Sequence, residues 1–535
     1  MKPGRAHRPL PAYLAKGEAG AVVLSLALVG VVAASRLGAV WAAGGWHEGE
    51  SDSALFAVGI WRWSHWGPHA TLLYDSPFSA GYYWLAGGWA QWRHLPLAGI
   101  SFWLDLLSFA AALAMAPLVF ALARRFVSPA AAFWSSLLFL LTPGVWMLGL
   151  EPHPQGLGMF LALAAFYCCL RAVAEPGRQR AAFLSLFVAA LAAALLVRSD
   201  AIFLYPAFLC AAFLPPGADA RLCRPGRGEW DRLLELTVGL AAAAALFFLA
   251  RAAILAQPAR ASQADSWRRI AGFIGRISPL HQVLPVITGL GPFVCLMAVA
   301  GLALLWRRAA GRAWPLWIVV WAGPGAAFWL LIRGNNARHM AIYSLPLLWF
   351  ACEGWARWRP APRRRRSWLA VAVLAALALD CFVVPASSDV TIYPSGNVVA
   401  SYRDLVHRES DMRALAAAMM ASAGRSRVPV VYFGSSTSPY LLLYALEANP
   451  SAVVAHAGYI TTLTWPPRGR LVFHEVFSSD DFLGATQGAR GARSLEYDAR
   501  GRRLWFLGEE WRWLPWHRRW YAGRAPLHAV VRGGK

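Results

Sequence analysis

Charged side chains are scarce in this sequence. Asp, Glu, Lys and Arg together make up 15% of its 535 residues, whereas apolar residues make up 58% and the mean hydropathy is +0.43. Soluble globular proteins keep about a quarter of their residues charged and only about 45–50% apolar. The composition therefore excludes an ordinary soluble protein and predicts a membrane protein.

Cysteine is also sparse, and none follows Cys381. All seven cysteines lie inside or beside apolar runs, and they give no disulfide framework. A region without cysteine cannot be stabilised by disulfide bonds. The part of the chain after about residue 387 must hold its fold by other means.

Acidic residues are outnumbered, with 28 Asp and Glu against 51 Lys and Arg and a formal net charge of +23. Most of the basic excess lies in short Arg-rich loops between apolar runs. Membrane topology and anionic lipid account for Arg in such loops. We therefore expect the lipid bilayer, and no nucleic acid, as a partner of these basic loops.

Long apolar runs are abundant. A helix needs about 20 apolar residues to cross roughly 30 Å of hydrocarbon. The first run is longer than the apolar stretch of a signal peptide, which indicates an uncleaved anchor. The fifth and sixth runs are nearly fused at VRSDAIFLYP, and a single broken helix there would invert the topology downstream. Runs of sufficient length predict eleven transmembrane helices, at approximately 19–41, 98–123, 130–148, 155–172, 181–198, 200–215, 233–256, 284–306, 313–332, 339–356 and 367–386.

Arg-rich loops fall on one side of these predicted spans. They are 123–126, 171–180, 220–232, 306–312 and 357–366, together with the basic N-terminus. The positive-inside rule makes that side cytoplasmic, in a multi-pass protein of the cell inner membrane. The turn at Glu151 and everything after about 387 then lie outside, on the periplasmic side. Loop 257–283 also lies outside, where its four arginines favour a surface for lipid phosphates over a topology error.

The region after 387 changes character. Its apolar runs shorten to strand length at 428–434 and 451–457, with a helix-like stretch at 439–448 between them. This β-α-β order predicts a small external α/β domain at 387–535, following a transmembrane domain at 1–386. GSSTS at 434–438 lacks the spacing of a phosphate-binding loop, so an ordinary turn is favoured. The Trp- and Arg-rich stretch 509–524 could dock on the bilayer or on the other domain.

Charged groups from different spans gather at the predicted outer face. Arg36 lies in the outer half of the first span, where a charge is expensive and usually has a partner or a function. The stretch GWHEGESDSALFAVGIW follows, with Glu48, Glu50 and Asp52 in five positions. We expect a cavity where these groups meet. The other outer turns contribute Glu151, His153, Arg198, Asp200, Arg333, Arg338 and His339.

Several short motifs resemble the glycosyltransferase C superfamily, the polytopic enzymes that take sugars from polyprenyl-phosphate carriers and include protein O-mannosyltransferases and lipid A aminoarabinose transferases. DSALFAVGIW at 52–61 is similar to the family's DE-x-x-Y-x-x-x-A segment, although Ser53 replaces the second acid and Phe56 the tyrosine. The resemblance covers about 385 residues. Its other matches are the Arg in ASRLGAV, SPFSAGYYWLAGG (76–88), Glu151, VRSDAIFLYP and ARHMAIYSLPL (337–347).

The resemblance implies a GT-C-like fold and transfer of a sugar from a polyprenyl-phosphate donor to an external lipid, glycan or protein hydroxyl. Such a displacement needs a carboxylate to take the acceptor proton and cations to bear the charge of the leaving phosphate. Asp52 is our candidate base, with Glu50 as a substitute for the acid missing at Ser53. Glu151 would hold the acceptor or, with Asp52, a divalent Mg²⁺ or Mn²⁺ ion. Because Arg binds phosphate bidentately, the candidates for the donor phosphate are Arg338, Arg333, Arg269 and Arg36.

Each candidate also has a structural interpretation. Glu151 can be a helix-end carboxylate, His153 a packed histidine, and Arg198 a structural partner of Asp200. Arg333 and Arg338, beside His339, can anchor lipid headgroups. These interpretations remain open from the sequence.

Two other functions also remain open. A transporter would place charges between helices too, but near the membrane midplane and in repeated halves, whereas here they lie at outer ends and we find no repeat. A non-catalytic scaffold or sensor using the external domain is the third reading, which Ser53 keeps open. Glycosyl transfer is the hypothesis that the motifs favour.

Overall fold

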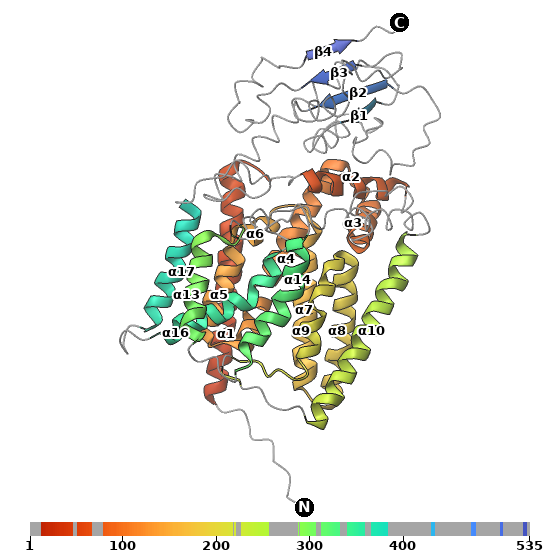
Figure 1. Cartoon of the computed structure of the whole chain (residues 1–535). Coiled ribbons are helices and arrows are strands. Elements are labelled where there is room, and N and C mark those ends of the chain that lie inside the picture. Colours follow the sequence, from red (N-terminus) through yellow and green to blue (C-terminus); the bar gives the residue numbers. More distant parts are fainter. Residues whose placement is uncertain are drawn as a thin grey trace, which may run out of the picture.

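The structure is a computed structural model of the whole chain. It describes residues 12–46, 51–66, 79–217, 219–220, 226–255, 287, 289–306, 312–331, 340–358 and 365–382, together with four short strands after residue 429. The chain folds as a bundle of long helices lying side by side, with α2, α3 and α6 at one end (Figure 1). It is a multi-pass helical membrane protein, as its composition predicts.

The helices follow the predicted apolar runs closely. Each of the eleven predicted spans coincides with one described helix or with short helices in tandem. Five are long and apolar enough to cross a membrane, and several others are shorter than a full crossing, so the count of eleven crossings stays a prediction. The elements are α1 (Ala12–Ala43), α2 (Ser51–Trp66), α3 (Ala80–Arg93), α4 (Leu97–Phe126), α5 (Pro129–Leu141), α6 (Pro143–Leu148), α7 (Pro154–Ala174), α8 (Gly177–Val197), η2 (Ser199–Leu204), α9 (Tyr205–Cys210), α10 (Arg227–Leu255), α13 (Pro292–Trp306), α14 (Trp314–Leu331), η3 (Ala341–Ser344), α16 (Leu345–Arg357) and α17 (Arg365–Phe382).

Exposed tryptophans mark the two ends of the bundle. Trp41 lies near the end of α1, and Trp84, Trp89 and Trp92 lie on α3, at the predicted outer end. Tryptophan concentrates at membrane–water interfaces because its ring is amphipathic. The two groups therefore indicate where the bilayer surfaces meet the bundle. The second group, beside the Arg-rich loops, is Trp230, Trp306, Trp358 and Trp368.

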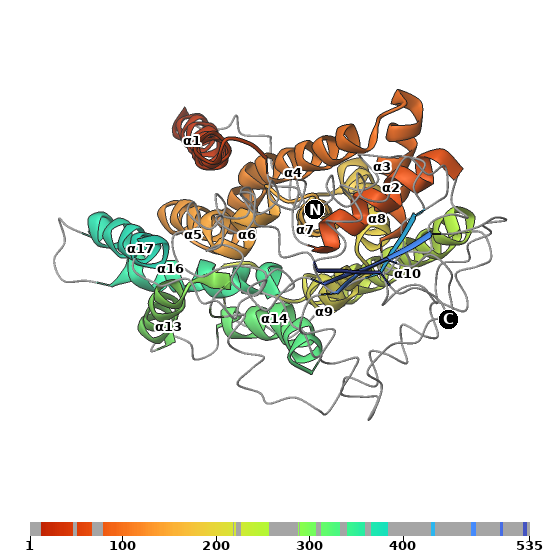
Figure 2. The ribbon, with the colours of Figure 1, turned by 90° about the horizontal axis from the view of Figure 1, so that it is seen from above.

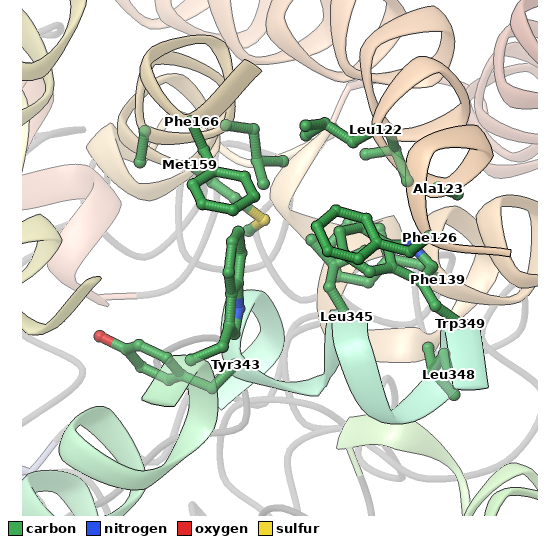
Figure 3. Packing of buried hydrophobic residues seen from close by; sticks show 14 of the residues in the cluster. Leu122, Ala123, Phe126, Phe139, Met159, Phe166, Tyr343, Leu345, Leu348 and Trp349 are labelled. Atoms are coloured by element: carbon green, nitrogen blue, oxygen red, sulfur yellow. The ribbon is translucent and has the colours of Figure 1, made fainter. Parts of the chain in front are cut away.

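Aromatic and aliphatic side chains pack together in the buried core of the bundle (Figure 3). Phe126 of α4 stacks on Trp349 of α16 with ring centroids 5.0 Å apart. Phe166 of α7 meets Trp321 of α14 edge to face at 4.6 Å. Such pairs contribute about 0.5–1.5 kcal/mol beyond the area they bury. They join helices from both halves of the chain into one core.

Two buried carboxylates cap helices that are distant in sequence. Glu353 of α16 accepts hydrogen bonds from the backbone N–H and the hydroxyl of Ser128, at 2.8 and 2.7 Å, where α5 begins. Asp380 of α17 accepts from the N–H groups of Phe293 and Val294 at 2.9 Å, where α13 begins. The first N–H groups of a helix have no partner within it, and the helix dipole favours negative charge there. These contacts fix α16 against α5 and α17 against α13.

The C-terminal region contributes a four-stranded sheet in the order β1 (Val430–Phe433), β2 (Val472–Phe477), β3 (Arg503–Phe506) and β4 (His528–Val531). The first two pairs are parallel and the last is antiparallel. β1 lies within the strand predicted at 428–434. The predicted helix 439–448 and strand 451–457 lie outside the described residues, and the sequence did not predict β2, β3 or β4. The α/β character of 387–535 stays a prediction.

Candidate active site beneath helix α2

Helix α2 covers the end of the bundle at which the outer charges were predicted. It packs against α3 and α4, and the view from above shows it alongside α3 (Figure 2). Its Phe56 ring is buried among Tyr82, Tyr83 and His153, with centroid distances of 5.7, 5.6 and 5.1 Å. Position 52 lies one helical turn before Phe56, so both share one face of α2. The candidate base Asp52 therefore sits on the face of the helix that covers Tyr82 and His153.

The turn before α7 carries Glu151 and places His153 against Phe56 of α2. Both residues are buried. His153 Nδ1 accepts a hydrogen bond from the Gln155 N–H at 3.3 Å and so caps α7, with Pro154 in the first helical position. Burial, and then the positive charge of Arg198, lower the pKa of His153 well below its ordinary value. The ring is neutral, and because Nδ1 accepts a hydrogen bond its hydrogen lies on Nε2.

Helix α4 adds polar residues that our sequence analysis did not single out. Ser101, Asp105 and Ser108 are buried at spacings of four and three residues, so they lie on one face. Burial, and then the charge of Asp105, raise the pKa of Tyr82 well above its ordinary value. The Tyr82 hydroxyl thus stays protonated and can donate. A carboxylate inside an apolar run is by default a functional candidate, and that signal could have identified Asp105.

We call Tyr82, Ser101, Asp105, Ser108, Glu151 and His153 the outer polar cluster. Its members come from α3, α4 and the turn before α7, and the first and last of them, Tyr82 and His153, are 71 positions apart in the sequence. Phe56 lies against Tyr82 and His153, so α2 closes the cluster from above. The buried hydroxyl and imidazole groups of this cluster can donate, accept and position protons, and α2 carries the candidate base at position 52.

Arg198 and Asp200 form the ion pair considered from the sequence, with Nη2 and Oδ2 3.2 Å apart at the end of α8. Gly158 of α7 permits this packing, since a Cβ there would lie 2.9 Å from the Arg198 Cβ. The pair lines a cavity of about 30 Å³, together with Gln155 and Tyr343 and an apolar wall that includes Met159. A cavity of this size holds a water molecule or two. It presents a cation, a carboxylate and an apolar wall side by side.

Arg36 lies in the outer half of α1, as predicted, and it contacts backbone carbonyls of neighbouring helices. Its guanidinium is fully buried, and Nη2 donates to the carbonyls of Leu140 and Val145 at 3.2 and 3.1 Å. Pro143 cannot donate a backbone N–H, so the helix breaks between α5 and α6 and leaves carbonyls to be satisfied. Arg36 satisfies them from α1. These contacts favour a structural role over the predicted contact with the donor phosphate.

Several predicted site residues lie outside the described residues, namely Glu50, Arg269, Arg333, Arg338 and His339. Their roles stay predictions. Within the described ranges, no three His, Cys, Asp or Glu residues are grouped so that they could hold a metal ion. Glu151 offers the hard oxygen ligands that Mg²⁺ or Mn²⁺ prefers, and its pairing with Asp52 around such an ion stays a prediction.

Comparison with known proteins follows the same lines. The family model described as dolichyl-phosphate-mannose-protein mannosyltransferase matches residues 85–244, which include α4, α7 and α8. A comparison with curated protein sequences gave no match. The matched segment carries most of the outer polar cluster.

Solved structures share the fold over almost the whole chain. ArnT from Cupriavidus metallidurans bound to undecaprenyl phosphate superposes with a TM-score of 0.52 at 17% identity, covering 90% of this chain and 96% of ArnT. The apo form of ArnT gives 0.51 at 15% identity, with coverages of 88% and 95%. The Archaeoglobus fulgidus oligosaccharyltransferase gives 0.46 at 13% identity, with coverages of 81% and 62%. The chain therefore shares the fold of ArnT, and its residues 85–244 resemble the mannosyltransferase family model.

Proposed function

We propose that this chain is an integral-membrane glycosyltransferase that moves a sugar from a polyprenyl-phosphate donor to an external acceptor hydroxyl. One observation carries the proposal: the helix that bears Asp52 closes a buried polar cluster at one end of the bundle. The fold shared with ArnT bound to undecaprenyl phosphate supports the choice of donor class. The mannosyltransferase family model over 85–244 supports the choice of reaction.

The reaction is a direct displacement at the anomeric carbon of the sugar. Asp52 takes the proton of the acceptor hydroxyl. The acceptor oxygen forms a bond to that carbon while the bond from the carbon to the phosphate oxygen breaks. Polyprenyl phosphate leaves as an anion, and arginines at the outer face bear its charge. One candidate for the donor phosphate is Arg198, which lines a cavity. Arg269, Arg333 and Arg338 are further candidates for the donor phosphate, from the sequence.

Glu151 has a supporting role in this scheme. It is buried in the turn before α7, one residue from Pro152 and two from His153. There it would orient the acceptor hydroxyl toward the anomeric carbon. A Mg²⁺ or Mn²⁺ ion held by Asp52 and Glu151 would supply further charge stabilisation for the leaving phosphate.

The proposal includes an orientation. The Arg-rich ends and the second tryptophan group face the cytoplasm, and α2 with the outer polar cluster faces the periplasm of an inner membrane. The region 387–535 then lies on the same side as the active site, where it would contact the acceptor or shield the site from water.

Turnover of defined donors tests the proposal. The full chain in nanodiscs is given undecaprenyl phosphate carrying mannose or 4-amino-4-deoxyarabinose, with an envelope lipid and glycan extract as acceptor, and the released undecaprenyl phosphate is measured. Asp52→Asn should lower release by a factor of about 10² or more, since general-base help is worth about 10² to 10⁴. Donor binding should stay nearly unchanged.

The matched control is Glu229→Gln, which neutralises a half-exposed carboxylate at the opposite end of the bundle and should leave release unchanged. Full turnover by Asp52→Asn would remove the base assignment. Movement of intact donor across the bilayer of a proteoliposome, without release of undecaprenyl phosphate, would favour the transporter. Binding with neither activity would favour the scaffold.

A further inference from the structure

Helix α4 carries a polar stripe inside an otherwise apolar span. Ser101, Asp105 and Ser108 are 2%, 1% and 1% exposed. Their spacing places them on one face of the helix, toward the protein interior. Polar and ionisable groups at this depth are expensive and tend to face a functional interior. Neither the family resemblance nor the proposed reaction assigns them a role.

The hydroxyl groups around this stripe lack protein partners. Among the residues that the structure describes, the hydroxyls of Ser79, Tyr82, Ser101 and Ser108 are buried and accept or donate no hydrogen bond. Serines in membrane helices usually donate to a carbonyl one turn earlier. Ser136 of α5 does so, donating to Ala132 O at 2.7 Å. Because buried polar groups without partners cost free energy, these four hydroxyls indicate a ligand that supplies the missing hydrogen bonds.

The stripe adjoins the candidate active site. The charge of Asp105 acts on Tyr82, whose ring lies 5.7 Å from that of Phe56. Ala112, one turn after Ser108, packs against Gly149 at the turn that leads to Glu151. The stripe is therefore the part of the outer polar cluster that α4 contributes, and it lies next to Tyr82 and to the turn that leads to Glu151.

The chemistry of the stripe selects among ligands. A phosphate is disfavoured because the Asp105 carboxylate would repel it. A sugar presents several hydroxyls that each donate and accept, which matches a carboxylate that accepts and serine and tyrosine hydroxyls that do both. We propose that Tyr82, Ser101, Asp105 and Ser108 form a subsite for the hydroxyl groups of the sugar that the polyprenyl-phosphate donor carries. This inference rests on the proposed function and deepens it.

The closed position of α2 has a consequence for binding. All four residues are buried, and the Phe56 ring of α2 lies 5.7 Å from that of Tyr82. The sugar can reach the subsite only when α2 and Phe56 move away from α3.

Binding of two matched probes tests the subsite. The full chain in nanodiscs is titrated with undecaprenyl phosphate and with undecaprenyl phosphate carrying mannose, galactose or 4-amino-4-deoxyarabinose. For the sugar that binds best, Asp105→Asn should weaken Kd by about tenfold or more, because a hydrogen bond to a charged acceptor is stronger than a neutral one. Kd for undecaprenyl phosphate itself should change less than about twofold. Ser136→Ala is the control and should change neither.

The outcomes separate the two proposals. If the unaltered chain does not bind undecaprenyl phosphate at all, the proposed function fails. If it binds, but Asp105→Asn weakens both probes equally or neither, the subsite is wrong. A rise in acceptor KM with unchanged donor Kd would also overturn it, since the stripe would then bind the acceptor. Should Asp105→Asn not fold, the double variant Ser101→Ala with Ser108→Ala gives the same readout, with a predicted loss of about tenfold for the glycosylated probe alone.

Discussion

Two arginines at the outer end of the bundle make different contacts, although their positions in the sequence are similar. Arg36 and Arg198 are both arginines near the outer ends of spans. Arg36 binds backbone carbonyls at the break between α5 and α6, whereas Arg198 pairs with Asp200 at the rim of a cavity. Only the three-dimensional partners distinguish an arginine that binds backbone carbonyls from one that pairs with a carboxylate beside a cavity.

Arg36 offers the first test at this scale. Arg36→Met should lower the melting temperature, because it leaves buried carbonyls without donors, and each costs about 1–3 kcal/mol. Affinity of the folded fraction for undecaprenyl phosphate should stay unchanged. Thermal melting in detergent and probe binding in nanodiscs measure the two effects. Loss of probe binding at an unaltered melting temperature would restore the predicted contact with the donor phosphate.

His153 makes stability depend on pH. Its pKa is lowered in the folded chain, so below about pH 6.5 the unfolded chain takes up a proton that the folded chain does not. Stability is therefore fully present above pH 6.5 and falls as the pH drops, by at most about 1.4 kcal/mol per pH unit. Melting temperatures between pH 7.5 and 5 should fall more steeply for the unaltered chain than for His153→Gln. Parallel curves would contradict a buried neutral His153.

At the scale of elements, helix α2 determines which residue of the acidic stretch lies on a helix that packs against the bundle. It begins at Ser51, so Asp52 lies in its first turn, where the helix dipole favours a carboxylate. Glu48 and Glu50 precede the helix. Position 52 shares a helical face with Phe56, so the packing of Phe56 determines where this residue of α2 lies.

The neighbouring acids provide the matched comparison. Glu48→Gln should change turnover of the glycosylated donor by less than about threefold, because Glu48 has no counterpart in the family motif and a general base is worth far more, about 10² to 10⁴. Glu50→Gln should fall between Glu48→Gln and Asp52→Asn in release of undecaprenyl phosphate. A loss equal to that of Asp52→Asn would show that Glu50 carries the acid role vacated at Ser53.

For the whole molecule, the sequence predicted the helices far better than the site. Apolar runs determine where helices form, and each predicted span coincides with described helix. The outer polar cluster depends on packing between α2, α3, α4 and the turn before α7, which no run or motif encodes. Asp105 was visible as a charge inside a span. The partners of Arg36, Glu353 and Asp380 were not, because each contact joins residues at least 86 positions apart.

Orientation is the prediction that belongs to the whole molecule. Reporter fusions at 220 and 450 should show cytoplasmic and periplasmic activity respectively, because the Arg-rich loops lie on the side of residue 220. A fusion at 95, between α3 and α4, should behave like the one at 450. Cytoplasmic-type activity at 450 or at 95 would contradict the predicted orientation of the bundle and would place α2 on the cytoplasmic side.

The two carboxylate caps can form only late in synthesis, because each carboxylate follows the N-terminus of the helix that it caps by at least 86 residues. The N–H of Ser128 donates to Glu353, which is 225 residues later in the sequence. At about 5–20 residues per second, the ribosome needs roughly 11–45 s to synthesise the residues between them. Until Glu353 is synthesised, the N–H of Ser128 lacks this carboxylate partner, and the N–H groups of Phe293 and Val294 lack Asp380 in the same way. The early helices therefore remain a provisional assembly until the last two helices of the bundle arrive. A chain that stops before α16 lacks both carboxylates, Glu353 and Asp380, although it contains most of the helices. We expect membrane quality control to degrade such a truncated chain.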